Sequence, residues 1–408
     1  MGALSHIRVL DLSRVLAAPF ATQILGDLGA EVIKIEKPGE GDETRAFGPP
    51  FLKDADGARG DATYFLTANR NKKSAAIDFS KPEGAAIVRR LARRAHVVVE
   101  NFKTGTLAKY GLDYETLKKE NPALIYCSLT GFGHTGPYKD KAGYDYLIQG
   151  MGGLMSITGL PDGAPGAEPM KVGVAISDLV TGLYTANAIQ AALIHQARTG
   201  EGQAIDMALF DCQVAGLANQ AMNYLSGGMV PGRMGNAHPN IVPYQVFATS
   251  DGHLILAIAN DGQFRRFCKA AGLENLSSDP RYATNAERVG HREELVTLLT
   301  PVFTTRSNVE WITALEAANV PCGPINRIDQ VFADPQAQAR GLTVSMPHAG
   351  SGDLDLVASP LRLEKTPPEY RHAPPLLGQH TGEILSEILG LHEDEVAALE
   401  SARVIALR

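Results

Sequence analysis

A carboxylate stands at the start of a helical pattern near the middle of the chain. Asp178 follows the segment "KVGVAIS" and precedes apolar residues at helical spacing, Leu179, Leu183 and Ile189. At this position an aspartate can cap a helix or interact favourably with its dipole. The same carboxylate can attack a carbonyl group and form a covalent intermediate. The segment alone favours the capping role, so the choice between the two roles depends on the rest of the chain.

The elements that would position this residue alternate along the first part of the chain. Strand-like apolar runs are separated by helical patterns, which predicts a parallel sheet covered on both faces. We therefore expect an α/β fold whose large domain is a doubly wound, Rossmann-like sheet. The runs interpreted as strands are 7–13, 30–36, 73–78, 96–101 and 124–133, and the helical patterns are 19–29, 83–95 and 114–122.

The loops after these strands are the expected binding edge, because ligands of such sheets bind beyond the carboxyl ends of the strands. These loops are 11–18, 36–41, 100–105 and 130–137. The first of them reads "SRVLAAPF", so it has no Gly-x-Gly-x-x-Gly fingerprint, and the chain has no Walker A sequence. A nicotinamide or flavin dinucleotide site is therefore not expected.

The second half of the chain has a different pattern. Residues 177–225 are helical and rich in small residues, with a break at "TGEGQAIDMAL". A hairpin pattern with its turn at 250–252 then precedes several helical patterns. We expect the N-terminal part of the large domain over 1–200, a linker over 201–225, a smaller α+β domain over 226–325 and a C-terminal segment over 326–408.

Composition and charge exclude several classes of protein. The chain has 408 residues, 44% hydrophobic and 20% charged, as in a soluble enzyme of two or three domains. The net charge of −7 argues against binding to nucleic acid or to acidic membranes. No apolar run is long enough for a membrane span, and the N-terminus does not resemble a signal peptide.

Cysteine and histidine usage bounds the compartment and the metal chemistry. The four cysteines are far apart and form no Cys-x-x-Cys pair, which favours reduced thiols in a cytoplasmic protein. The 11 histidines are scattered, without a His-x-x-x-His or Cys/His grouping. We therefore expect no metal site.

A series of segments in one consistent order, from residue 9 to 381, resembles the class III CoA-transferase (CaiB/BaiF) family. The segments are "VLDLSRVLAAPFATQILGDLGAEVIKIEKPGEGDETR", "NRNKKSAAID", "ENFKTGTLAKYGLDYETL", "CSLTGFGHTGPYKDKAGYD", "GVAISDLVTGLY", "TGEGQAIDMALFD" and "PPLLGQHT". The resemblance implies a large domain built from both chain ends, with 326–408 returning to it, and a homodimer of interlocked subunits. The segments "GNAHPNIVPYQVF", "CGPIN" and "PPLLGQHT" look most like the branch that includes succinyl-CoA:glutarate CoA-transferase.

The resemblance also implies a reaction. Such enzymes move CoA from an acyl-CoA to a carboxylic acid, and the branch resemblance implies succinyl-CoA as donor and a short dicarboxylate such as glutarate as acceptor. The family motif places the nucleophile at Asp178, which would form an aspartyl anhydride and then an aspartyl-CoA thioester. An aspartate with the ordinary pKa of about 3.9 is ionised at neutral pH and needs no separate base. CoA and its esters are substrates, and no permanently bound cofactor is expected.

Several residues match family positions that contact acyl-CoA. Leu16 and Ala17 match the turn that lines the thioester, although Leu16 fits simple core packing equally well. The formyl-CoA branch carries glutamine where this chain has Leu16, which argues against formate–oxalate exchange. The other matched positions are Lys37, Ile77, Ser80, Asn101, Phe102, Lys103 and Lys109. Arg45, Lys72 and Lys73 are further basic residues near the binding edge, where they would suit phosphates.

Two groups of residues bear on the substrate. Gly143, Tyr144 and Asp145 distinguish branches, because the α-methylacyl-CoA racemases carry histidine where this chain has Tyr144. A tyrosine of ordinary pKa, about 10, is a poor base at neutral pH, which disfavours the racemase alternative. The presence of Asp178 disfavours a non-catalytic CoA-binding protein. Arg233 and His238, at the start of the smaller domain, are candidates for binding the distal carboxylate of a dicarboxylic acid.

Overall fold

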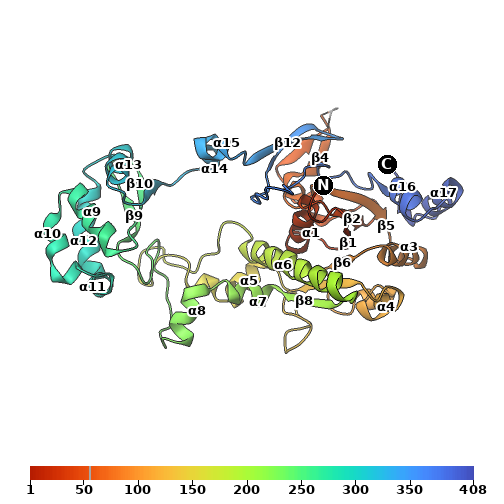
Figure 1. The fold of residues 1–408 in the computed structure, drawn as a ribbon, viewed down its shortest axis with the longest axis horizontal. Coiled ribbons are helices and arrows are strands. Elements are labelled where there is room, and N and C mark those ends of the chain that lie inside the picture. Colours follow the sequence, from red (N-terminus) through yellow and green to blue (C-terminus); the bar gives the residue numbers. More distant parts are fainter. Residues whose placement is uncertain (55–56) are drawn as a thin grey trace. The chain divides into compact units, whose positions relative to one another are not determined.

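The computed structural model describes residues 1–54 and 57–408 and forms two compact units (Figure 1). The larger unit comprises residues 1–154, 171–228 and 336–408, and the smaller unit comprises 155–170 and 229–335. Both chain ends therefore belong to the larger unit, and the smaller one is inserted between its parts. This is the α/β architecture with an inserted domain that the sequence predicts.

A seven-stranded sheet forms the centre of the larger unit, in the order β14-β5-β2-β1-β6-β7-β8. All neighbouring pairs are parallel except β14, which pairs antiparallel with β5. The parallel strands follow the doubly wound order, which reverses between β1 and β6 and opens a crevice there. The strands are β1 Arg8–Asp11, β2 Glu31–Glu36, β5 Lys72–Ile77, β6 Val97–Glu100, β7 Ile125–Thr130, β8 Ala204–Ala208 and β14 Ile405–Ala406.

Helices cover both faces of this sheet because alternate strand residues face opposite layers. Val9 packs in a core with Leu25 and Ile189, whereas its neighbour Leu10 packs in a second core with Val88. The helices of this unit include α1 Ala17–Asp27, α2 Thr63–Leu66, α3 Pro82–Arg93, α4 Tyr114–Glu120, α5 Asp145–Met151, α6 Ile176–Thr199, α7 Leu209–Ala215, α8 Ala218–Leu225, α15 Pro335–Ala339, α16 Thr381–Glu383 and α17 Glu393–Ser401.

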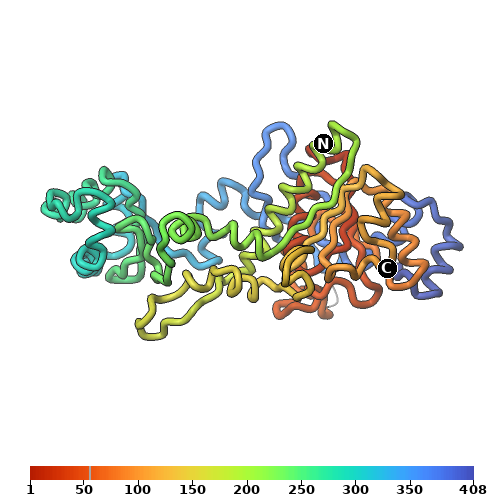
Figure 2. Tube along the Cα trace, turned by 90° about the horizontal axis from the view of Figure 1, so that it is seen from below, coloured from red at the N-terminus to blue at the C-terminus, as the bar shows by residue number. Residues whose placement is uncertain are grey.

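The C-terminal segment completes the larger unit. Figure 2 shows it lying beside the first part of the chain, and β14 adds an edge strand through the pair Ile405 and Ile77. Two hairpins, β3 Phe51–Lys53 with β4 Arg59–Ala62 and β12 Thr343–His348 with β13 Gly352–Val357, also belong to this unit. The C-terminal residues therefore contribute directly to the sheet that carries the binding edge.

The smaller unit has its own core of aromatic residues. Phe303 stacks on Phe247 at a centroid distance of 4.4 Å, and the Trp311 indole donates to the Phe303 carbonyl at 2.8 Å. The expected hairpin is confirmed, since β9 pairs antiparallel with β10 on either side of residues 249–252. The main elements are β9 Tyr244–Ala248, β10 His253–Ala257, β11 Cys322–Pro324, α9 Asp261–Ala271, α10 Glu274–Ser278, α11 Asn285–Gly290, α12 Arg292–Phe303, α13 Asn308–Ala317 and α14 Ile328–Ala333.

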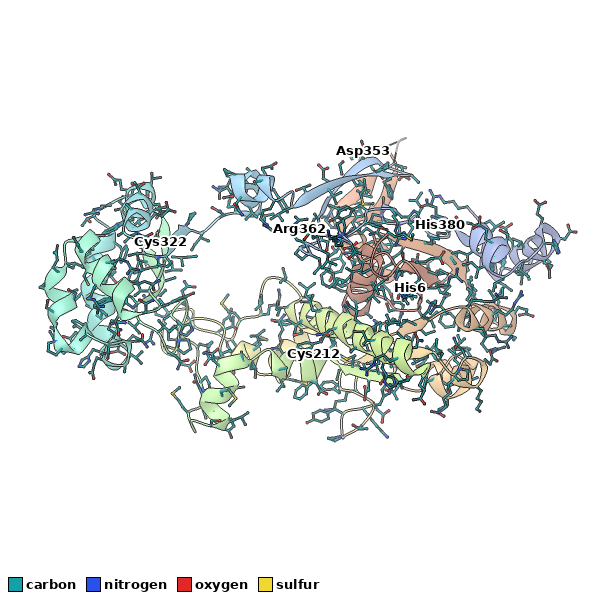
Figure 3. The ribbon with its side chains drawn as sticks, in the orientation of Figure 1. His6, Cys212, Cys322, Asp353, Arg362 and His380 are labelled. Atoms are coloured by element: carbon teal, nitrogen blue, oxygen red, sulfur yellow. The ribbon has the colours of Figure 1, made fainter. Side chains whose placement is uncertain are left out.

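All four cysteines are free, as their spacing predicts. Cys212 lies on α7 and Cys322 on β11 (Figure 3). Burial raises the pKa of Cys268 to about 12, so this thiol is not a reactive one at neutral pH. Among the described residues, no helix has the length and apolar character needed to cross a bilayer.

Candidate active site

A cleft of about 280 Å³ opens at the carboxyl ends of β1, β6 and β7 in the larger unit. This is the edge at which the strand order reverses, where a doubly wound sheet binds its ligands. The cleft brings together loops that are far apart in sequence. Of the residues singled out from the sequence, its lining includes Leu16, Ala17, Asn101, Phe102, Lys103, Gly143, Tyr144, Asp145 and Asp178.

Asp178 lies in the first turn of α6 and is only 9% exposed. Its pKa is raised to about 7, first by burial and then by the nearby negative charge of Asp145. The expectation that this aspartate has an ordinary pKa is therefore wrong, because the sequence does not show how deeply the side chain lies. At neutral pH the carboxylate is close to its midpoint and is a stronger base than a solvated aspartate.

Asp145 performs the capping role that the sequence alone suggested for Asp178. Its Oδ1 accepts the backbone N–H of Ser177 at 2.8 Å and that of Asp178 at 3.3 Å, so it caps α6 from the start of α5. Gln149 donates to the other oxygen at 2.7 Å. Within residues 1–54 and 57–408 no group donates a hydrogen bond to the Asp178 carboxylate, which leaves both of its oxygens available to a substrate.

The loop between β1 and α1 lines the cleft together with Asp178. The Asn101 amide clamps it through two bonds to the Arg14 backbone, at 2.9 Å from the N–H and 2.7 Å to the carbonyl. The Arg14 guanidinium lies over the Phe102 ring at 4.7 Å and pairs with Glu43. Asn101 and Phe102 therefore shape the cleft partly by holding this loop in place.

Sequence reasoning missed further basic residues of the cleft. Arg14, Lys139 and Lys141 line it together with Lys103, and Lys141 lies over the Tyr138 ring at 3.7 Å. Lys139 and Lys141 belong to the segment that follows β7, just beyond the predicted loop 130–137. Their position in a strand-to-helix connection at the binding edge was the available signal. Such a set of cations suits a phosphorylated ligand.

Other predicted contacts lie outside the cleft lining. Lys37 is exposed and pairs with Glu40 at 2.6 Å, and Ile77 is fully buried in β5. The Ser80 hydroxyl donates to Asp78 at 2.5 Å, and Lys109 lies in a short 3-10 helix, Leu107–Tyr110. The structure thus separates these four residues from the walls that surround Asp178.

Arg45, Lys72 and Lys73 do not line the cleft, so the structure does not place them where they would meet a phosphate there, and each is paired with carboxylates inside the fold. Arg45 forms two hydrogen bonds to Glu36, at 2.8 and 2.7 Å, and Lys72 pairs with Asp11 at 3.0 Å. Lys73 pairs with two glutamates, Glu383 at 2.6 Å and Glu31 at 3.4 Å. Spacing along the sequence cannot show such partners, since they come from different strands and helices.

Arg233 and His238 both belong to the smaller unit. Arg233 pairs with Asp162 and donates to the Leu160 carbonyl at 3.1 Å. The Nδ1 atom of His238 accepts the N–H of Asn240 at 3.0 Å. Burial, and then the charge of Arg292, lower the pKa of His238, so this imidazole is neutral at pH 7. A substrate carboxylate would compete with Asp162 for Arg233.

Comparison with known proteins identifies the family of this chain. Residues 4–381 match the family model described as "CoA-transferase family III". The chain belongs to this family. This CoA-transferase is 54% identical, over 94% of its length and 95% of the relative, to succinate–glutarate CoA-transferase of Agrobacterium fabrum. It is 45% identical to succinyl-CoA:glutarate CoA-transferase of Mus musculus, over 99% of its length and 91% of the relative.

A solved structure agrees with this assignment. The CoA-transferase superposes on a CaiB/BaiF family protein from Brucella suis with a TM-score of 0.83 and 50% identity, covering 95% of this chain and 99% of the other. Family and branch resemblance are thus confirmed, and the chain is an enzyme of the class III CoA-transferase type. Its described residues contain no cluster of histidine, cysteine, aspartate and glutamate suited to a metal ion.

Proposed function

We propose that this CoA-transferase moves CoA from succinyl-CoA to glutarate through a covalent intermediate on Asp178. Relatives named for succinate–glutarate and succinyl-CoA:glutarate transfer, at 54% and 45% identity, support the substrate pair. The observation that carries the mechanism is the Asp178 carboxylate, which lies in the cleft wall without a hydrogen-bond donor from the described residues. A nucleophile needs such freedom, whereas a structural aspartate is normally satisfied by donors.

The reaction follows from this placement. An ionised Asp178 oxygen attacks the succinyl thioester carbonyl, the C–S bond breaks, and the products are a mixed succinyl-aspartyl anhydride and the CoA thiolate. The thiolate attacks the aspartyl carbonyl of the anhydride and releases succinate, which leaves CoA as a thioester of Asp178. Glutarate attacks this thioester and displaces the thiolate to give a second anhydride. Attack of the thiolate on the glutaryl carbonyl forms glutaryl-CoA and restores Asp178.

The cleft would serve each of these steps. Asp178 is mostly buried in the cleft wall, which limits the access of water that would otherwise hydrolyse the anhydride. Arg14, Lys103, Lys139 and Lys141 supply positive charge to phosphates of CoA, while Leu16, Ala17 and Gly143 to Asp145 surround the thioester. We assign Lys37, Ile77, Ser80 and Lys109 to the nucleotide end of CoA, outside the walls that enclose the reacting atoms.

We further propose that the enzyme is a cytoplasmic homodimer. Four free thiols suit a reducing compartment. Exposed apolar side chains on α6 and α8, among them Ile194 at 64% and Leu225 at 73%, suit burial against a second copy.

One assay tests the reaction. Purified enzyme is incubated with succinyl-CoA and a panel of monocarboxylic and dicarboxylic acids, and new CoA esters are identified by mass spectrometry. Glutaryl-CoA is the expected main product, and Asp178→Ala should lower its rate by at least about a thousandfold, since losing a covalent nucleophile costs orders of magnitude. Deuterium uptake at the α-carbon without transfer would indicate a racemase instead. Neither product would indicate a binding protein.

A variant tests recognition of the second carboxylate. Arg233→Ala should raise the KM for glutarate by more than about tenfold over the change for a monocarboxylate of equal length, because removing one partner of a desolvated charge pair costs about 2–5 kcal/mol. Asp162→Ala is the control, since it frees Arg233 from its pair and should not raise that KM. Equal effects on both acids would exclude Arg233 from this role.

A further inference from the structure

The loop between β1 and α1, which lines the cleft, contains a residue in an unfavourable backbone conformation. Val15 has φ of 69°, in the left-handed region. Among the described non-glycine residues with positive φ, it alone is β-branched. A β-branched residue adopts this conformation only when its surroundings impose it, and such strain clusters at functional sites. Val15 lines the cleft together with its neighbours Leu16 and Ala17.

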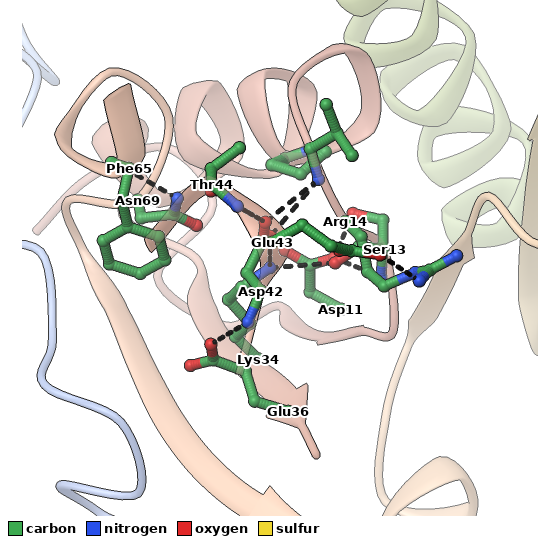
Figure 4. A network of polar contacts seen from close by, with 12 residues as sticks. Asp11, Ser13, Arg14, Lys34, Glu36, Asp42, Glu43, Thr44, Phe65 and Asn69 are labelled. Carbon is green, nitrogen blue, oxygen red and sulfur yellow. Dashed lines mark hydrogen bonds and ion pairs between the residues drawn. The ribbon is translucent and has the colours of Figure 1, made fainter. Parts of the chain in front are cut away.

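The backbone of Val15 is hydrogen-bonded to a buried ion pair of Asp42 and Lys34, and Figure 4 shows these two residues in their network of polar contacts. The Val15 N–H points between the two carboxylate oxygens of Asp42, at 3.3 Å from each. Asp42 pairs with Lys34 at 2.8 Å, and both side chains are completely buried. The Lys34 ammonium also donates to the Ser13 carbonyl at 2.8 Å. Ser13 and Val15 are thus both held by the same pair of opposite charges.

Asp42 is itself firmly fixed. Its Oδ1 accepts the Thr44 N–H at 3.0 Å and the Thr44 hydroxyl at 2.7 Å, and its N–H donates to Glu36 at 2.9 Å. Despite burial, the charge of Lys34 and these hydrogen bonds lower the pKa of Asp42 to about 2. The anchor therefore remains charged at neutral pH.

A movement of this loop would reach the reacting atoms. α1 begins at Ala17 and packs against α6, and a Cβ atom at Gly182, one turn after Asp178, would lie only 2.7 Å from the Ala17 carbonyl oxygen. The absence of a side chain at Gly182 thus permits the two helix starts to lie in contact. Asp42 does not line the cleft, so its influence on the reaction passes through the loop.

We infer that Asp42 is a positioning residue for CoA transfer, which holds Val15 in its left-handed conformation and thereby sets the Leu16–Ala17 wall at the correct distance from Asp178. The inference rests on the proposed role of Asp178. Burying the charges of Asp42 and Lys34 costs desolvation free energy, and a buried ion pair by itself contributes little to stability. A role in positioning the loop explains why this pair is buried beside the cleft.

The test compares two buried aspartates. Asp42→Asn keeps the shape of the side chain but removes the charge that holds Val15. Asp27→Asn is the matched control, because Asp27 pairs with Arg70 at 2.6 Å with both side chains nearly buried, at the far end of α1. Both variants should lower Tm, but only Asp42→Asn should lower kcat, by at least about tenfold, as expected for a misplaced reacting wall. Equal kcat values in the two variants would overturn the inference.

A second pair of variants leaves the ion pair intact, in case Asp42→Asn does not fold. Glycine adopts the left-handed conformation without strain, whereas proline is fixed near φ of about −65° and has no N–H. Both variants remove the valine side chain from the cleft lining, so the contrast between them isolates the backbone conformation, and Val15→Pro should have a kcat at least about tenfold lower than that of Val15→Gly. Similar kcat values for both would refute the role of the conformation. An active Asp178→Ala enzyme would instead refute the role of Asp178 as nucleophile. The difference in kcat between Val15→Gly and Val15→Pro would still show whether the conformation of Val15 matters.

Discussion

The chemistry of the proposed nucleophile depends on where a single carboxylate lies. Burial and the charge of Asp145 raise the pKa of Asp178 to about 7. A carboxylate with a higher pKa is a better nucleophile when ionised, but a smaller fraction of it is ionised at neutral pH. The same placement therefore affects both the activity and the stability of the enzyme as functions of pH.

The activity should rise with pH through the titration of Asp178. Only the ionised carboxylate attacks the thioester, so kcat/KM for succinyl-CoA should fall about tenfold per pH unit below about pH 6 and level off above about pH 8. Initial rates between pH 5.5 and 8.5, with thermal unfolding followed at each pH, measure this. A flat profile over this range would mean that the reacting carboxylate has an ordinary pKa.

The stability should change in the opposite direction. Since the folded-state pKa of Asp178 lies above its ordinary value of 3.8, the unfolded chain loses its proton first as pH rises from about 4 to 7, and stability falls over this window. Asp178→Asn removes this penalty. The Tm of Asp178→Asn should exceed that of wild type by more at pH 8 than at pH 5. The full cost of ionising the buried Asp178, summed over the whole window from about pH 4 to 7, is at most about 4 kcal/mol in unfolding free energy, at about 1.4 kcal/mol per pKa unit. A Tm difference independent of pH would contradict this.

At this scale the sequence predicts residue types better than their partners. Asp178 and the cleft residues 101–103 and 143–145 follow from motifs, because motifs keep residue order. The cap from Asp145 does not follow, since it joins residues from two helices. Lys72 appears in the sequence as an available cation, whereas in the fold it is buried against Asp11. Charges that lie in a strand can face inward, and only the three-dimensional partner decides their role.

The start of α6 is the element that carries the nucleophile. Its cap residue, Ala175, has no side-chain hydrogen bond to offer, so Asp145 supplies the cap from α5. This arrangement couples two helices to one reacting group. Substitution of a helix-capping residue usually lowers only the stability of the protein. Here the negative charge of the capping residue, Asp145, also raises the pKa of Asp178.

Asp145→Asn should separate the two effects. Asparagine keeps an oxygen that can accept the N–H groups of α6, but it removes the negative charge that raises the pKa of Asp178. The acid limb of the pH–rate profile should therefore move to lower pH. Asp211→Asn, at an exposed carboxylate on α7, is the control and should leave the limb unchanged. A limb that stays in place in Asp145→Asn would show that burial alone sets this pKa.

Periodicity predicts most elements of the sheet but not its edge. The strands β1, β2, β6 and β7 lie within the runs expected from the sequence, and β5 begins one residue before its expected run. β8, Ala204–Ala208, falls in a segment interpreted as a break between helices. Its residues are mostly exposed or half-buried, so they lack the continuous apolar character of the central strands. An edge strand covered on few sides leaves a weak signal in the sequence.

At the scale of the whole molecule, exposed apolar surface remains to be explained. α8 has no buried residue, and its large apolar side chains Met222, Tyr224 and Leu225 are each more than half exposed. On α6, Leu183 and Ile194 are also more than half exposed. Composition counts these residues as core material, and only the fold shows that they are left uncovered. These exposed apolar side chains are candidates for burial against a second copy of the chain.

The enzyme should therefore be a homodimer that does not dissociate on dilution. Light scattering coupled to size-exclusion chromatography should give about twice the 43.5 kDa chain mass at all concentrations down to micromolar. Leu225→Glu introduces a charge on α8 and should reduce the dimer recovered after refolding, because burying an unpaired carboxylate is unfavourable. Leu298→Glu is the control, since Leu298 is an exposed apolar residue of the smaller unit, on α12, and should leave the mass unchanged. A wild-type mass of one chain would exclude the dimer and leave the apolar face of α8 for another partner.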